Sequence, residues 1–269
     1  MHQRAPNDGL AASSALAPPL PGFENEPPLE GKFARSPGRP APLVTTQVPV
    51  AKRTFDFVGA LSLLVVTAPL MAVIAPLVWL DSRGPVFYTQ ERVGLNRRRG
   101  RRRLDQVPVR QEFRGLERRA QPAEGRPFQI VKFRTMIQGA EEATGPTWAT
   151  PDDPRVTRVG RVLRSTRLDE LPQLWNVLCG QMSLVGPRPE RPHFVNQFAR
   201  RIPGYRDRLG TLPGITGLAQ VEHSYDGSEA DVRRKLTYDL EYLRRTSIKD
   251  DLWILVRTLY VMVTRRGAH

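Results

Sequence analysis

The stretch FVGALSLLVVTAPLMAVIAPLVWL, residues 57–80, decides the fold class of this chain. It consists of 24 consecutive uncharged residues, with charges from Lys52 to Asp56 before it and at Asp81 and Arg83 after it. An uncharged run of this length is typical of a segment that enters a membrane. A buried helix of a soluble protein is the alternative, and the length of the run disfavours it.

Pro69 stands at the midpoint of this run. Proline removes a backbone donor and bends or breaks a helix. Each half reaches roughly 18 Å at about 1.5 Å per residue, which is less than the roughly 30 Å of a hydrocarbon core. Two arrangements stay open: a kinked helix that spans the membrane, or a helix–break–helix that returns to the same face. Cationic residues on both flanks slightly favour the second.

Composition separates other parts of the chain. Residues 1–50 hold ten of the 25 prolines and predict a disordered tail. The net charge of +14 suits nucleic acid, anionic lipid or phosphorylated substrates. Half of that excess lies in residues 97–126, where eleven arginines face four acids. Cys179 is the single cysteine, which excludes an intrachain disulfide.

The pattern of apolar residues predicts strands, helices and tight loops in the remaining chain. Strands are expected at 85–91 and 127–134, helices at 155–180, 230–246 and about 250–264, and fixed turns at 186–190 and 212–217. The last helix is apolar almost all round and too short to span a membrane. It therefore packs in a core or lies in the membrane interface.

Two adjacent acids, Asp169 and Glu170, lie in the cationic stretch RVLRSTRLDELPQ. One explanation is structural, because Thr166 could cap a helix whose positive end favours acids. The other is chemical. Phosphoryl transfer needs cations and usually a metal on the phosphoryl oxygens, and a carboxylate can attack phosphorus or hold Mg²⁺.

Three further basic residues are candidates for phosphate contact. Arg188 lies in the proline-bounded loop GPRPE, which would hold its guanidinium with little flexibility. Lys132 and Arg134 lie two residues apart and are expected on one face of a strand. Taken singly, each of these residues is as well explained by an ordinary surface position.

Taken in order, these segments resemble the bacterial sugar transferases, which are also called monotopic phosphoglycosyl transferases. The matching segments are KRTFDFVGALSLLVVTAPL (52–70), GPVFYTQERVG (84–94), FQIVKFRTM (128–136), VGRVLRSTRLDELPQLWNVLCGQMSLVGPRPE (159–190) and PGITGLAQV (213–221), followed by the closing helices. Each motif alone is weak, but their order over some 200 residues is very specific. The tail and residues 97–126 fall outside the resemblance.

The resemblance implies transfer of a sugar-1-phosphate from a UDP-sugar to undecaprenyl phosphate, with release of UMP, at the start of exopolysaccharide, capsule or O-antigen synthesis. It implies Asp169 as a nucleophile that forms an aspartyl phosphosugar, Glu170 as a Mg²⁺ ligand, and Arg164 as a phosphate-binding residue. Further residues fall in motifs that line the substrate site: Lys132, Arg134, Pro187, Arg188 and Glu190.

The resemblance also implies an architecture. A mainly helical α+β fold is expected, with a re-entrant membrane helix over 51–83 that bends at Pro69. A small catalytic domain over 84–266, carrying an arginine-rich insertion at 97–126 and amphipathic interfacial helices, would lie on the cytoplasmic face of the bacterial inner membrane. Membrane lipids are the further partners, and homo-oligomerisation is left open.

Three positions depart from the family pattern. Ala68 stands where the family often has a serine, so a hydroxyl at the bend is lost. The insertion at 97–126 replaces a short turn, and Leu212 stands where a basic residue often precedes PGITG.

Two other functions compete with the enzyme. The arginine cluster suggests nucleic-acid binding, but it lacks interleaved aromatic residues and a reading helix, so no nucleic acid is expected. The second competing function is a membrane scaffold whose site has lost its activity. The intact pair of acids argues against it.

Overall fold

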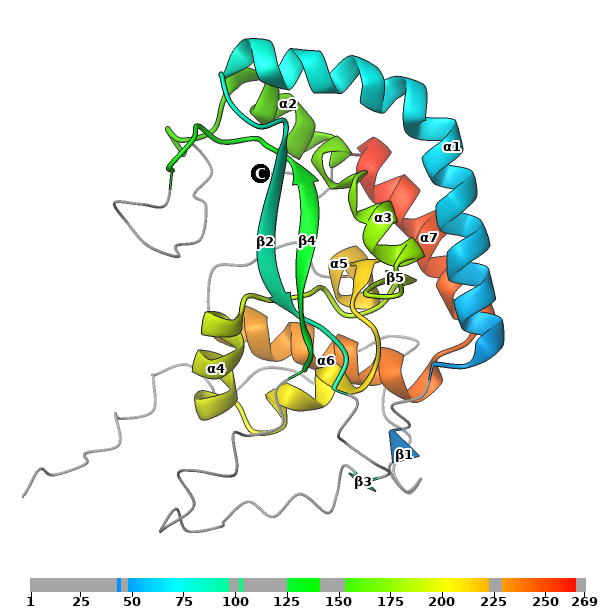
Figure 1. Cartoon of the computed structure of the whole chain (residues 1–269). Coiled ribbons are helices and arrows are strands. Elements are labelled where there is room, and N and C mark those ends of the chain that lie inside the picture. Colours follow the sequence, from blue (N-terminus) through cyan, green and yellow to red (C-terminus); the bar gives the residue numbers. More distant parts are fainter. Residues whose placement is uncertain are drawn as a thin grey trace, which may run out of the picture. The chain divides into compact units, whose positions relative to one another are not determined.

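A computed structural model describes residues 43–44, 48–96, 102–103, 125–140, 153–222 and 229–264. These residues form helices and three two-stranded sheets, with helix predominating, which confirms the mainly helical α+β class (Figure 1). Most of the predicted disordered tail, 1–50, and most of the arginine-rich segment lie outside the described residues.

Helix α1, Val50–Asp81, contains the whole uncharged run. It is long and apolar enough to cross a membrane. Pro69 and Pro76 lie inside it, and Figure 1 shows the helix changing direction along its length. The hydroxyl of Thr67 donates to the carbonyl of Leu63 at 2.7 Å, a back-bond that bends helices. One continuous helix therefore runs through Pro69, where a kink or a break was expected.

The N-terminal end of α1 is held by a buried ion cluster. The ammonium of Lys52 lies 2.9 Å from Asp56 and 2.7 Å from Asp251, and both carboxylates are fully buried. Asp56 also accepts a hydrogen bond from the backbone N–H of Leu184 at 3.1 Å. Asp251 accepts another from the hydroxyl of Tyr242 at 2.8 Å. The cluster around Lys52 thus joins α1 to the segments that carry Leu184, Tyr242 and Asp251.

The C-terminal end of α1 packs against the same folded body. Ile74 and Val78 are buried in a cluster with Phe133 and Leu163. The carboxylate of Asp81 accepts a hydrogen bond from the backbone N–H of Val159 at 2.8 Å. Both ends of this long apolar helix therefore contact one polar domain, with the bend between them.

Large apolar side chains are exposed on two helices. Of the 24 exposed large hydrophobic residues in the described part of the chain, twelve lie on α1 and seven on α7, Ile248–Thr264. A concentration of this kind marks a membrane or partner surface rather than water-facing protein. Helix α7 also confirms the final helix predicted at about 250–264.

The two strands predicted at 85–91 and 127–134 are confirmed, and they pair as a hairpin. Strand β2, Phe87–Val93, pairs antiparallel with β4, Pro127–Phe133, with Phe87 opposite Phe133 and their rings stacked at 5.3 Å. Strands β1, Leu43–Val44, and β3, Arg102–Arg103, form a second antiparallel pair.

A parallel strand pair was not expected. Strand β5, Ser183–Val185, pairs with β6, Gly214–Thr216, so the segment 212–217, predicted as a loop with fixed turns, contains a short strand. A Cβ on Gly214 would lie 2.1 Å from the backbone nitrogen of Gly186. The backbones approach too closely for any side chain, and this contact between distant segments leaves no periodic pattern.

The continuous helix predicted over 155–180 is also wrong. The segment forms three pieces: α2, Arg158–Ser165, the 3₁₀ turn η2, Leu168–Glu170, and α3, Gln173–Leu178. Arg167 has a φ of 57°, in the left-handed region, which ends the first piece. Pro172 precedes the third piece. The apolar stripes continue across the breaks, so periodicity alone predicted a single helix.

The remaining elements complete the domain. They are α4, Pro192–Arg201, the 3₁₀ turn η3, Tyr205–Gly210, α5, Leu218–Glu222, and α6, Glu229–Arg245. Helix α6 confirms the prediction over 230–246. A core cluster joins α4, η3, α6 and the end of β2 around Val195, Tyr205 and Leu236.

Replacing Lys52 by methionine is expected to lower the melting temperature of the purified protein strongly. The change leaves two buried carboxylates without their shared cation, and breaking a buried ion pair costs about 3–5 kcal/mol. Lys249→Met removes an exposed lysine from α7 and is the matched control. Equal melting temperatures for the two variants would contradict the structural role given to Lys52.

Candidate active site

The two acids lie in the short turn η2, between α2 and α3. Asp169 is 8% exposed and Glu170 6% exposed. Thr166 does not cap them: it ends α2, and its hydroxyl donates to the carbonyl of Val162 at 2.7 Å. The structural explanation by a Thr166 cap is therefore wrong, and the burial of two adjacent carboxylates needs another reason.

Glu170 is held by two cations. The ammonium of Lys132 donates to its Oε1 at 2.9 Å, and the guanidinium of Arg188 donates to Oε1 at 2.6 Å and to Oε2 at 3.3 Å. Burial opposes ionisation of Glu170, but the charges and hydrogen bonds of Arg188 and Lys132 outweigh it. They hold the pKa of this carboxyl well below its usual range. Glu170 is thus a permanent anion at the centre of the cluster.

Asp169 is bound more loosely. Its Oδ2 lies 4.0 Å from the ammonium of Lys132, beyond hydrogen-bond distance. Burial raises the pKa of Asp169, and the negative charge of Glu170 raises it further, against the effect of Lys132. Of the two carboxylates, Asp169 is the more basic and has the less occupied oxygens. These are the properties of a nucleophile.

The loop that carries Arg188 is held from behind. The carbonyl of Pro187 accepts from the backbone N–H of Gly214 at 3.0 Å. Arg208 donates to the carbonyl of Arg188 at 2.9 Å and to Asp239 of α6 at 2.8 Å. Arg208 and Asp239 were missed from the sequence, because no motif links two residues 31 positions apart.

Two other predicted site residues, Arg134 and Arg164, do not contact the acid pair directly in the part of the chain that the structure describes. Arg134 donates to the carbonyls of Ser82 and Arg83, so it contacts the end of α1 and does not share the partner of Lys132. Arg164 lies in the last turn of α2, and its positive charge acts on Asp169 without a direct contact.

Glu190 lies 3.6 Å from the guanidinium of Arg92, which also donates to the carbonyl of Pro189 at 3.0 Å. Arg92 was not singled out from the sequence, although it lies in the quoted segment GPVFYTQERVG. It holds the far end of the loop that carries Arg188.

The carboxylates fit a magnesium ion only together with a substrate. In the part of the chain that the structure describes, no group of three or more potential metal ligands comes together. Mg²⁺ is often bound by one or two carboxylates and completed by substrate phosphates. Glu170 would supply one such carboxylate, and the phosphates of a substrate would complete the coordination.

Comparison with known proteins decides the family. The model of the family described as "Bacterial sugar transferase" matches residues 47–101 and 113–265. The chain belongs to the bacterial sugar transferase family. The unmatched internal stretch, residues 102–112, lies inside the insertion expected at 97–126, and both carboxylates and the loop of Arg188 lie in the matched part.

The curated relatives of this sugar transferase include proteins named as transferases between a UDP-sugar and undecaprenyl phosphate. A UDP-glucose:undecaprenyl-phosphate glucose-1-phosphate transferase of Caulobacter vibrioides is 38% identical over 87% of this chain and 76% of its own length. A UDP-N-acetylgalactosamine-undecaprenyl-phosphate N-acetylgalactosaminephosphotransferase of Aeromonas hydrophila is 40% identical over 81% of this chain. The match spans 44% of that relative's length.

Replacing Arg208 by methionine is expected to destabilise this sugar transferase by about 3–5 kcal/mol, because Asp239 would stay buried without its cation. Arg233→Met is the control, since it removes an exposed partner of Glu229 on the same helix, α6. An exposed pair contributes about 0.2–1 kcal/mol. Thermal unfolding in detergent measures both variants, and a similar effect for the two would refute the role of Arg208.

Proposed function

We propose that this chain transfers a sugar-1-phosphate from a UDP-sugar to undecaprenyl phosphate and releases UMP. The observation that carries the proposal is the unequal pairing of two buried carboxylates, with Glu170 saturated by Lys132 and Arg188 and Asp169 left with free oxygens. The names of the relatives support both substrates. The pathway it would serve is synthesis of exopolysaccharide, capsule or O-antigen.

The reaction has two steps. A carboxylate oxygen of Asp169 attacks the phosphorus that bears the sugar, the bond from that phosphorus to the bridging oxygen breaks, and UMP leaves with the bridging oxygen. A phosphate oxygen of undecaprenyl phosphate then attacks the aspartyl phosphosugar. A diphosphate bond forms, the bond to Asp169 breaks, and the free carboxylate returns.

The cations around the acids would bind the diphosphate. Lys132 and Arg188 are already positioned at Glu170, so an incoming phosphate needs to replace only a carboxylate oxygen. Arg164 lies close enough for its charge to stabilise negative charge that develops at Asp169. Mg²⁺ held by Glu170 and the diphosphate would neutralise the charge of the leaving phosphate.

The apolar surface supports a place in the membrane. The exposed residues of α1 and α7 would contact lipid, and the two ends of α1 pack against the same domain. We therefore favour a re-entrant course for α1, bent at Pro69, with the domain on the cytoplasmic face of the inner membrane. The amphipathic helices of the domain would then lie at the interface between membrane and water.

Replacing Asp169 by asparagine is expected to abolish UMP release, since the amide cannot attack phosphorus. The assay offers a panel of UDP-sugars with undecaprenyl phosphate and Mg²⁺, and a chelator arm tests the metal. Glu91→Gln, an exposed carboxyl on β2, is the control and should keep full activity. Retained turnover in Asp169→Asn at an unchanged melting temperature would disprove the nucleophile.

Labelling of introduced cysteines is expected to place both ends of α1 on one side of the membrane. Val50→Cys and Pro85→Cys, at exposed positions, are made in a Cys179→Ala background, and an impermeant maleimide is applied to spheroplasts and to inside-out vesicles. Cys179 of the unmodified chain is exposed and reports the side of the domain. All three should react only in inside-out vesicles. Opposite labelling of the two ends would show a true span.

A further inference from the structure

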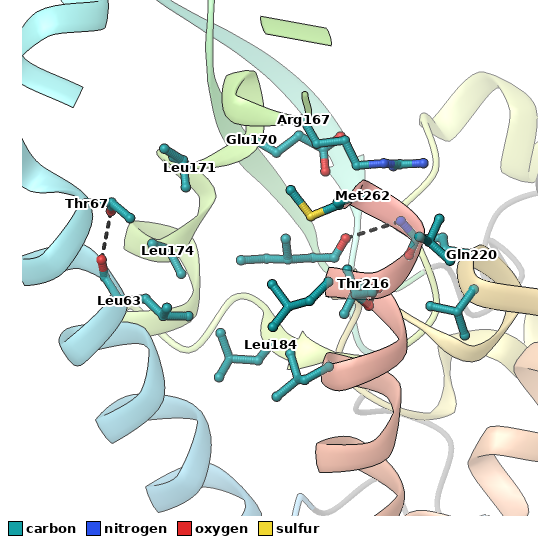
Figure 2. Close-up of a pocket in the computed structure, with 16 residues that line it drawn as sticks. Leu63, Thr67, Arg167, Glu170, Leu171, Leu174, Leu184, Thr216, Gln220 and Met262 are labelled. Carbon is teal, nitrogen blue, oxygen red and sulfur yellow. Dashed lines mark hydrogen bonds between the residues drawn. The ribbon is translucent and has the colours of Figure 1, made fainter. Parts of the chain in front are cut away.

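An apolar pocket lies directly beside the acid pair. Its volume is about 210 Å³, and its walls come from α1, α3, β5, β6, α5 and α7. Most lining side chains are aliphatic, among them Leu63, Leu174, Leu184, Leu255 and Leu259. Figure 2 shows Arg167 and Glu170 together at one end, with Leu63, Leu174 and Leu184 farther away. The pocket therefore has a charged end and an apolar body.

The few hydroxyls in the walls do not make the pocket polar. Thr216 and Thr258 share a hydrogen bond at 2.7 Å, and Thr67 donates to the carbonyl of Leu63. A uridine or a sugar placed among these walls would lose hydrogen bonds to water without replacement, which is costly. The occupant that fits is a hydrocarbon with an anionic head.

Arg167 is the unusual residue at the charged end. It is the one non-glycine residue with a positive φ among those the structure describes, a conformation that costs about 1–2 kcal/mol. Strain of this kind is kept mostly where function needs it. With the other described residues its guanidinium makes no hydrogen bond or ion pair, whereas Lys132 and Arg188 are both occupied by Glu170. A cation is therefore available at the mouth of the pocket.

We propose that this pocket takes the first isoprenoid units of the lipid acceptor and that Arg167 binds the phosphate of that lipid. The inference rests on the proposed function and adds the place where the acceptor binds. A cavity of about 150 Å³ lined by aliphatic and aromatic groups takes up benzene. The volume here thus suits one or two five-carbon units.

The position of the pocket gives the lipid a route that avoids water. Two of its walls, α1 and α7, carry the exposed apolar residues. A chain embedded in the bilayer could enter between these helices, while a UDP-sugar would approach Asp169 from the polar side formed by Lys132 and Arg188. The lipid phosphate would then reach Asp169 past Arg167 and Glu170, which line the pocket.

The test separates the two half-reactions of the full-length protein in lipid nanodiscs. UMP release from the UDP-sugar without acceptor reports the first, and sugar-phosphate transfer at varied undecaprenyl phosphate reports the second. Arg167→Asn removes the charge and keeps a residue that tolerates the left-handed region. We expect the acceptor KM to rise roughly tenfold or more, with the KM for the UDP-sugar unchanged, and partial recovery in Arg167→Lys.

A second variant tests the apolar body of the pocket. Met262→Trp places a larger side chain in the wall just below Arg167 (Figure 2) and should also raise the acceptor KM several-fold. Leu252→Trp, on the exposed side of the same helix and outside the pocket, is the control and should leave it unchanged.

The outcomes separate this inference from the proposed function. If the unmodified protein releases no UMP from any UDP-sugar, the proposed function fails. If it does, and either Arg167→Asn or Met262→Trp leaves the acceptor KM unchanged, the acceptor site proposed here is wrong while the function stands.

Discussion

The arrangement of this protein depends on a single buried lysine. Lys52 lies between two fully buried carboxylates, one on its own helix and one on α7. Without Lys52 both carboxylates would stay buried without the cation that they share, and burying an unpaired charge is far more costly than burying a hydrocarbon. Asp56 in turn accepts from the backbone of β5, and Asp251 from Tyr242. The pair of helices that carries the apolar surface is thus joined to the strands behind the active site by polar contacts that no lipid can replace.

This polar attachment explains how an apolar helix and an ionic active site coexist. Helix α1 buries few of its side chains and exposes most of the rest, so packing alone would hold it weakly. Contacts at its two ends hold it in place. The Lys52 cluster holds one end, and Asp81 with Ile74 and Val78 holds the other. The change of direction between these two ends lets both attachments form at once (Figure 1). The acid pair, on η2, then lies beside the segment of α1 that lines the pocket.

Sequence patterns predicted the parts of this structure that rest on local chemistry. The uncharged run, the β2–β4 hairpin, α6 and α7 follow from length and periodicity, and the acid pair stood out because it lies among arginines. Features that depend on contacts between distant segments were missed. Gly186 and Gly214 meet because neither has a side chain, Arg208 reaches Asp239 across two elements, and the left-handed Arg167 divides a segment whose apolar stripes look continuous. In each case the deciding interaction has no period along the chain.

The distribution of charge at the site indicates why so many arginines surround only two acids. Lys132 and Arg188 neutralise Glu170, which leaves the charge of Asp169 largely unbalanced in a buried place. A diphosphate that draws these two cations toward itself would expose Glu170 as well, so a further cation must enter with the donor. In the proposed mechanism the lipid phosphate arrives later and meets the aspartyl phosphosugar, an acyl phosphate, rather than a free Asp169, and it would need a cation that the donor has not already used. Arg167, which lines the apolar pocket together with Glu170, would supply that cation (Figure 2).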